Sequence, residues 1–478
     1  MKILITKYIV CLLLLCGLMQ SQTAKQKPAP AASTAAQSSG LKLPAYKKVT
    51  LKNGLTLLLM EQHKLPIISF SYIVRAGSTS DPKGKEGLAS LTAGLLRKGT
   101  KSRTSEQISN DLDYIGMTFG ANASPDNSGG SAEFIKKDTA RAVDLFADVL
   151  LNPVFPADEV AKLQKQRIDG IKSAKDSVQG VMSAYYDAYL FAGHPYGRPA
   201  NGDEKSLASI AQPDVASFYS ANYTPGNTIL AVAGDFSSVE MERLLSDKFQ
   251  SWNSKSGKSA ALPQAATFTG KKFLLIDKPD STQTYYYIGN VGIARNNPDR
   301  VYVNLVNTLF GGRFTSMLNT DLRIKSGLTY GASSFFSRRV APGPFAITSF
   351  TKNATTEKAL DMTLDVIKRL HEKGITEAEL QSAKNYIKGQ FPPTIETSDA
   401  LAATIADLEF YGLDASDIND LYSKIDSMTV ATAQRVINQY FPADNLVFVV
   451  VGKASEIEAS AKKYAPVFEK KSITDPGY

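Results

Sequence analysis

Cysteine and histidine are nearly missing from this chain of 478 residues. The two cysteines, Cys11 and Cys16, lie close to the N-terminus, and the three histidines are His63, His194 and His371. No two histidines can share one face of a helix, so a zinc site would need ligands from distant parts of the chain. The residues after Cys16 contain no cysteine, which excludes disulfides and thiol chemistry there.

Each histidine lies in a setting that favours a structural role. His63 lies in EQHKLP, which we expect to be a hairpin loop, and His194 lies in GHPYG, a turn bounded by glycine and proline. His371 comes near the end of an expected helix, where a cation interacts favourably with the helix dipole. The sequence also lacks the G-x-S-x-G motif of serine hydrolases. On this inventory the chain does not resemble a self-sufficient enzyme.

The first residues have the pattern of an export signal. Lys2 and Lys7 precede an apolar run at residues 8–19. This run is shorter than the roughly 20 residues that a membrane-spanning helix needs, so we expect a cleaved signal peptide at residues 1–24 and no transmembrane segment. The expected location of the mature protein is the periplasm.

Residues 25–44 are rich in alanine, serine, proline and glutamine and show no apolar period. Such a composition is typical of a flexible tether between an export signal and a folded region. A lipid anchor on Cys16 is an alternative to simple cleavage, although Leu15 before it is bulkier than such a site normally allows.

Charged residues of both signs are scattered along the chain. The formal net charge is +8, and without the signal peptide 52 basic and 46 acidic residues leave +6. Like-charged neighbours do not exceed pairs such as Lys136-Lys137. A nucleic-acid groove would concentrate lysine and arginine on one element, so we expect no nucleic-acid partner.

The chain contains two similar halves on either side of a polar stretch at residues 254–270. The first half, 45–253, ends with YTPGNTILAVAGD, and the second, 271–470, ends with YFPADNLVFVVVGK. In each of these two stretches an aromatic residue and a proline are followed by an apolar run that ends at a glycine. Repetition over about 200 residues predicts two homologous domains joined by a linker at 254–270.

Short apolar or alternating segments alternate with longer helical patterns in both halves. We expect strands at residues 55–60, 68–75, 273–277 and 282–289, and mostly helices at 156–220 and 374–440. This alternation predicts an α+β fold in which each domain has an antiparallel-rich sheet covered by helices.

Several stretches together resemble the pitrilysin/insulinase family of zinc peptidases, in particular its half-length branch with the mitochondrial processing peptidase. They occur in family order across most of residues 45–465: LKNGLTLLL, IVRAGSTSDP, GLASLTAGLLRKGT, GHPYGRP, YTPGNTILAVAGDF, LFGGRFTSMLNTDLRIKSGLTYGASS and YFPADNLVFVVVG. The resemblance implies two homologous α+β domains joined by a linker, in agreement with the duplication.

The family's zinc motif is degenerate in this sequence. Active members carry H-x-x-E-H on a helix of the first domain and a glutamate ligand about 75 residues further on. The two histidine positions correspond to Ser90 and Gly94, the general base to Ala93, and the distal ligand to Gly170. Asp169 is adjacent, but one residue turns a helix by about 100°, so its carboxylate would point elsewhere. We expect no metal site in this chain.

A second family pattern is retained in the other half. Active members use an arginine and a tyrosine seven residues apart to hold the substrate and the developing oxyanion, and LRIKSGLTY keeps them as Arg323 and Tyr330. A guanidinium and a phenol suit a negatively charged tetrahedral intermediate, and Gly327 allows the chain to turn between them. The structural alternative is an arginine that caps helix-end carbonyls and a tyrosine packed in a strand. At the corresponding position of the first half stands Phe119.

The resemblance therefore implies the non-zinc subunit of an exported heterodimeric metallopeptidase. A homologous partner would carry the zinc, and this chain would have no peptidase activity alone. Peptides or unfolded segments would bind by adding a strand to a sheet edge. One alternative is an inactive homologue that acts as a peptide-binding or scaffold protein; another, an active peptidase with an unusual metal site, conflicts with the few histidines.

Overall fold

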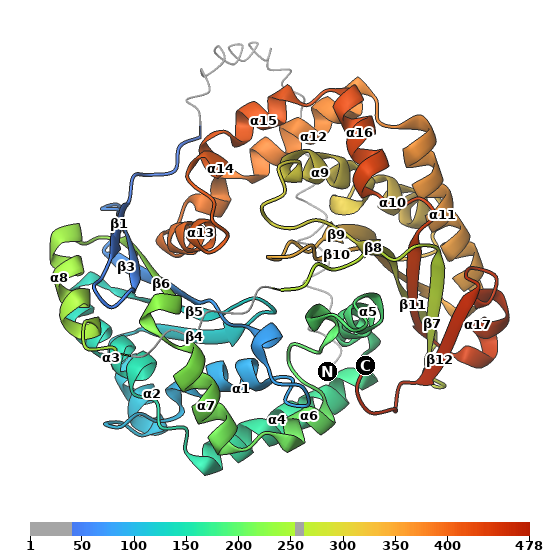
Figure 1. Ribbon diagram of the computed structural model, residues 1–478. Coiled ribbons are helices and arrows are strands. Elements are labelled where there is room, and N and C mark those ends of the chain that lie inside the picture. Colours follow the sequence, from blue (N-terminus) through green and yellow to red (C-terminus); the bar gives the residue numbers. More distant parts are fainter. Residues whose placement is uncertain (1–40, 254–261) are drawn as a thin grey trace, which may run out of the picture. The chain divides into compact units, whose positions relative to one another are not determined.

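Two six-stranded sheets and the helices around them form the fold in the computed structural model (Figure 1). The structure describes residues 41–253 and 262–478. The expected signal peptide, the tether up to residue 40 and part of the expected linker, 254–261, lie outside the described residues. Among the described helices, none is both long enough and apolar enough to cross a membrane.

The first sheet has the order β1-β2-β6-β3-β5-β4. Its strands are β1 (Lys47–Thr50), β2 (Thr56–Glu61), β3 (Ile67–Val74), β4 (Thr118–Ala123), β5 (Ser128–Ile135) and β6 (Thr228–Gly234). Strands β2 and β6 run parallel and the other neighbours run antiparallel. Every residue of β6 is buried, as its continuous apolar sequence predicts for a central strand.

The second sheet repeats this arrangement with the order β12-β7-β11-β8-β10-β9. Its strands are β7 (Lys271–Asp277), β8 (Gln283–Val291), β9 (Ala332–Phe336), β10 (Pro344–Lys352), β11 (Leu446–Gly452) and β12 (Val467–Ser472). The all-buried strand β11 takes the place of β6, again parallel to its neighbour β7. The expected α+β fold with two homologous domains is confirmed. The halves differ at one edge, where β12 comes from the C-terminus and runs parallel to β7.

The helices occupy the segments between the strands. In the first half they are α1 (Leu88–Leu95), α2 (Ser105–Tyr114), α3 (Thr139–Leu151), α4 (Ala157–Asp176), α5 (Met182–Leu190), α6 (Glu204–Ser209), α7 (Gln212–Asn222) and α8 (Ser238–Phe249). In the second half they are α9 (Arg300–Asn307), α10 (Met317–Asn319), α11 (Thr356–Lys373), α12 (Glu377–Gln390), α13 (Ser398–Phe410), α14 (Ser416–Asn419), α15 (Leu421–Ser427), α16 (Val430–Tyr440) and α17 (Ala454–Ala461). Wide π-helical turns at Thr308–Gly312 and Thr320–Lys325 flank α10.

The two halves exchange one helix each. Helix α13 of the second half packs on β3 and β6 of the first sheet, where Ile405 is fully buried with Leu58 and Ile229. Helix α5 of the first half packs on β8 and β11 of the second sheet, and the Tyr186 hydroxyl donates to the Phe345 carbonyl at 2.8 Å. Burial of each large apolar side chain contributes about 1.5–3 kcal/mol, so this exchange holds the halves together.

The expected hairpin around His63 is wrong. Strand β6 lies between β2 and β3, so the segment that contains His63 connects two strands that are not neighbours. The cause is a long-range pairing, because β6 comes from more than a hundred residues further along the chain. His63 is exposed, and its Nδ1 lies 2.6 Å from Oδ1 of Asp235, which directly follows β6. His194 has the expected structural role, since it accepts from the Tyr196 amide and contacts the Pro263 carbonyl.

Candidate functional site

Helix α1, which carries the degenerate motif, begins at a left-handed glycine and a buried carboxylate. Gly87 has a φ of 93°, a conformation that glycine adopts without strain. The Asp81 side chain accepts from the amides of Gly87 and Ala89, both at 2.8 Å, and so satisfies donors at the start of the helix. Burial raises the pKa of Asp81 to about 7, although these hydrogen bonds oppose the shift.

The space beside the motif is filled by a guanidinium. Arg167 on α4 donates to the Ser90 hydroxyl at 2.5 Å and to the Ser90 carbonyl at 2.9 Å. The same hydroxyl donates to Asn201 at 2.9 Å. A Cβ added at Gly94 would lie 3.0 Å from the Arg167 guanidinium and 3.1 Å from Leu163. A side chain at Gly94 therefore needs the side chains of Arg167 and Leu163 to move by a few tenths of an ångström.

The distal position lies away from this contact. Gly170 is exposed and a Cβ there would meet no atom within 4 Å, whereas Ala93 is buried. Asp169 pairs with Lys165 on the outer side of α4, with 2.6 Å between Nζ and the carboxylate, so it does not face α1.

These residues do not fit the zinc ion that active relatives of the resembled family bind. A hydroxyl, a methyl group and two glycines supply no pair of nitrogen or carboxylate ligands. Arg167 adds a cation in the same place, and its pKa is lowered by burial alone. Across residues 41–253 and 262–478, no group of three His, Cys, Asp or Glu side chains could hold a metal ion.

The second candidate site lies where the π-helical turn at Thr320–Lys325 gives way to β9. Asp321 is buried in this turn and pairs with Arg369 and with Lys325, which fixes the start of the segment. Gly327 has a φ of 64° and reverses the chain, and the Leu328 amide donates back to the Leu322 carbonyl at 2.9 Å. This turn brings Arg323 and Tyr330 to the same cavity of about 640 Å³.

Arg323 and Tyr330 are both exposed. The Tyr330 side chain is 80% accessible, and the tyrosine precedes β9 rather than packing within it. The Arg323 side chain makes no hydrogen bond or ion pair with any residue that the structure describes; its guanidinium carbon lies 4.8 Å from the centre of the Phe314 ring. The structural alternative, a helix-capping arginine with a packed tyrosine, is not the arrangement found. Phe119 of the first half, in contrast, is buried in β4.

Arg323 also borders a second cavity of about 500 Å³ with aromatic walls. Phe314 and Tyr386, which are 60% and 41% exposed, line it together with Gln179 and Met182 of the first half and further residues of the second half. These four residues are missing from the sequence-based site. Phe314 lies in the quoted LFGGRF segment. No motif indicates the other three: Tyr386 lies in α12, Gln179 in the 3-10 turn at Val178–Gly180, and Met182 at the start of α5.

Comparisons with known proteins agree with the two-domain fold. The family model described as Insulinase (Peptidase family M16) matches residues 57–204, and the model described as Peptidase M16 inactive domain matches residues 209–387. The crystal structure of a peptidase M16 inactive domain from Pseudomonas fluorescens is similar, with a TM-score of 0.81 and 28% identity, covering 85% of this chain and 98% of that chain.

Two curated relatives are similar over most of their length. An uncharacterized zinc protease of Rickettsia felis is 27% identical over 340 residues, which are 71% of this chain and 81% of that protein. An uncharacterized zinc protease of Mycobacterium leprae is 26% identical over 402 residues, which are 83% of this chain and 90% of that protein.

Proposed function

Because the chain belongs to the insulinase family of peptidases (family M16), we propose that it is the non-zinc subunit of an exported, heterodimeric metallopeptidase. A homologous subunit carries the zinc, and this chain supplies Arg323 and Tyr330 to a shared site. The apolar segment after Lys2 and Lys7 supports export to the periplasm.

The observation that carries the proposal is the state of Arg323. An arginine that caps a helix or belongs to an ion-pair network donates hydrogen bonds through its guanidinium N–H groups. Arg323 donates no such hydrogen bond to the described residues, and it lies between two cavities. A cation there can stabilise the negative charge that develops on a scissile carbonyl oxygen, and the Tyr330 hydroxyl can donate a second hydrogen bond.

The first half supports the division of labour. The Arg167 guanidinium and the Ser90 hydroxyl occupy the region in which active relatives hold the metal. Water activation therefore belongs to the partner, and this chain binds and orients the substrate. Substrates are peptides or unfolded segments. Strands β4 and β9 are sheet edges that can pair with an extended chain, and the exposed Phe314 and Tyr386 offer apolar contacts to its side chains.

The experiment that tests this function compares three preparations with an unstructured peptide as substrate: this chain, its zinc-carrying homologue and their mixture. We expect cleavage only in the mixture. A neighbouring gene for an exported homologue with an intact H-x-x-E-H motif identifies the partner to be used. Full activity of the homologue without this chain would contradict the proposal.

The names of the matched family model and of the Pseudomonas structure, both containing "inactive domain", favour one alternative. In that case the chain binds peptides or assembles with other proteins and takes no part in cleavage. Peptide binding by this chain, together with a mixture that is no more active than the homologue alone, would support this alternative.

A further inference from the structure

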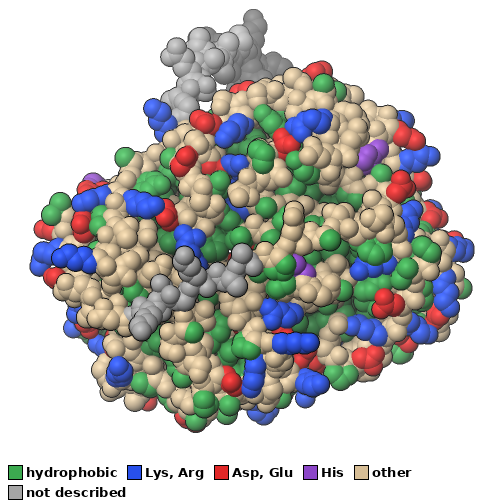
Figure 2. Space-filling model, viewed as in Figure 1, with side chains coloured by type: hydrophobic (Ala, Val, Ile, Leu, Met, Phe, Trp, Pro, Cys, Tyr) green, Lys and Arg blue, Asp and Glu red, His purple; other side chains and the backbone are tan. Residues whose placement is uncertain are grey.

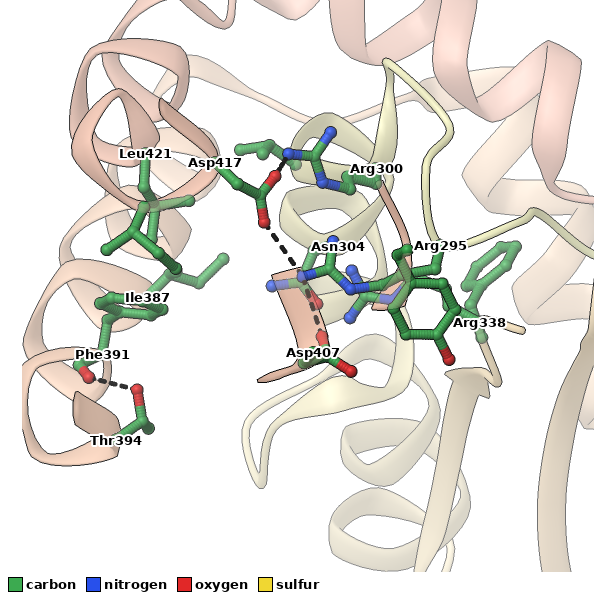
Figure 3. A pocket seen from close by; sticks show the side chains of 14 residues that line it. Arg295, Arg300, Asn304, Arg338, Ile387, Phe391, Thr394, Asp407, Asp417 and Leu421 are labelled. Atoms are coloured by element: carbon green, nitrogen blue, oxygen red, sulfur yellow. Dashed lines mark hydrogen bonds and ion pairs between the residues drawn. The ribbon is translucent and has the colours of Figure 1, made fainter. Parts of the chain in front are cut away.

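A separate cavity of about 550 Å³ lies in the second half, between β9 and helices α9 and α12–α15, and shares no lining residue with the two cavities at Arg323 (Figure 3). One wall is apolar and includes Ile387, Phe391 and Leu421. The opposite wall carries three arginines, Arg295, Arg300 and Arg338. The family motifs described above do not include this cavity.

Two of the three arginines are neutralised by carboxylates. The Arg295 guanidinium lies 3.0 Å from the Asp417 carboxylate and 3.4 Å from the Asp407 carboxylate. Arg300 also pairs with Asp417, which is almost fully buried. Three permanent cations thus face two carboxylates, and the wall has an excess of one positive charge.

The excess charge resides on Arg338. This side chain is half-buried and makes no hydrogen bond or ion pair within residues 41–253 and 262–478. Burial lowers its pKa and the neighbouring Arg295 lowers it further, whereas the nearby Asp407 carboxylate and Tyr411 oppose the shift. Removing a cation from water without a hydrogen-bonded partner is costly, and Asp407, which also pairs with Arg295, offsets this cost only in part, so an unfavourable charge remains at the edge of an open cavity. An anion that enters the cavity would compensate this cost.

We propose that this cavity binds a small organic monoanion that combines a carboxylate with an apolar group. The carboxylate pairs with Arg338, whose planar guanidinium matches both oxygens of a carboxylate, and the apolar group packs against Ile387, Phe391 and Leu421. The volume lies within the range of roughly 300–1,000 Å³ that is usual for small-molecule sites. A C-terminal peptide residue and a short fatty acid share this chemistry.

The test uses N-acetyl-leucine and octanoate as the two acidic probes and their uncharged amides as matched ligands. Binding is measured by calorimetry on the wild-type chain, on Arg338→Gln and on Arg141→Gln, which alters an exposed arginine beside the Tyr114 ring. We expect at least one acid to bind the wild type and the Arg141 variant, while the amides bind neither. Because Arg338→Gln loses the charge-assisted pair, we expect this variant to bind the acid about tenfold more weakly, or worse, than the wild type.

Binding of octanoate alone would identify a fatty acid as the source, and binding of N-acetyl-leucine alone would identify a peptide terminus. The proposal is overturned if neither acid binds, if the amides bind as tightly as the acids, or if Arg338→Gln binds as tightly as the wild type. If inorganic phosphate binds more tightly than both acids, the claim that an apolar group of the ligand packs in the cavity is overturned. The comparison of acid with amide on the wild-type chain stays decisive if Arg338→Gln does not fold.

Discussion

Restoring the four family residues should not by itself restore a zinc site, because Arg167 occupies the space. The perturbation is the variant Ser90→His, Ala93→Glu, Gly94→His and Gly170→Glu, with and without Arg167→Met. A side chain at Gly94 meets the guanidinium at 3.0 Å, and that group already donates two hydrogen bonds to Ser90. In the four-residue variant the restored zinc ligands and the Arg167 guanidinium therefore compete for the same space.

Two outcomes are open to the guanidinium, and both cost free energy. If it stays about 4 Å from a Zn²⁺ ion, repulsion is about 8 kcal/mol at an effective dielectric constant of about 20. If it leaves, it loses its remaining hydrogen bond, the one to the carbonyl of residue 90, because Ser90→His removes the hydroxyl. A hydrogen bond of the charged type is worth about 1.5–3 kcal/mol. The smaller cost is about 1.5–3 kcal/mol, so adding Arg167→Met should tighten zinc binding by roughly tenfold to 100-fold.

Zinc affinity is measured by competition with a chromophoric chelator. The control adds Arg141→Met to the four-residue variant and should leave the affinity unchanged, since Arg141 is exposed on α3. Equal zinc affinity with and without Arg167 would refute the reasoning that a guanidinium, in addition to the lost ligands, keeps zinc out of this helix.

Three further predictions concern stability. Ile405→Ala should lower the free energy of unfolding by about 2–5 kcal/mol, measured by denaturant titration, because the side chain is fully buried between α13 and the first sheet. Tyr186→Phe should cost about 1 kcal/mol in the same assay, since its hydroxyl donates to Phe345. Asp81 holds its proton more tightly in the folded state, with a pKa near 7, than in the unfolded chain, with the ordinary value of 3.8. Its contribution to the free energy of unfolding is therefore complete below pH 3.8 and is lost as the pH rises to 7. Relative to Asp81→Asn, the free energy of unfolding of the wild type should fall by up to about 4 kcal/mol between pH 4 and pH 7. Identical dependence of that free energy on pH in the two proteins would contradict this.

Much of the fold follows from local sequence patterns. The apolar runs predicted the two buried central strands, β6 and β11, and the similarity of the halves predicted one arrangement used twice. Side-chain period and apolar length are local properties, so one sequence suffices for them. The scattered charges also agree with Figure 2, in which basic and acidic side chains are interspersed on the face shown.

The remaining features depend on contacts between distant segments. The sequence indicates that α5 and α13 are apolar, but not that each covers the sheet of the other half. The misplaced hairpin at His63 has the same origin, because β6 pairs between β2 and β3. Arg167 and Arg338 likewise lie outside every motif, and only the packing around them reveals what they contact.

The central claim is that Arg323 acts in cleavage carried out with a zinc-carrying partner. The most direct measurement is kcat of the assembled complex with wild-type chain and with Arg323→Gln, after gel filtration has shown equal assembly. We expect kcat to fall by about 10²–10³-fold, the usual loss when one oxyanion donor is removed, with little change in KM. An unchanged kcat in the assembled Arg323→Gln complex would contradict the claim.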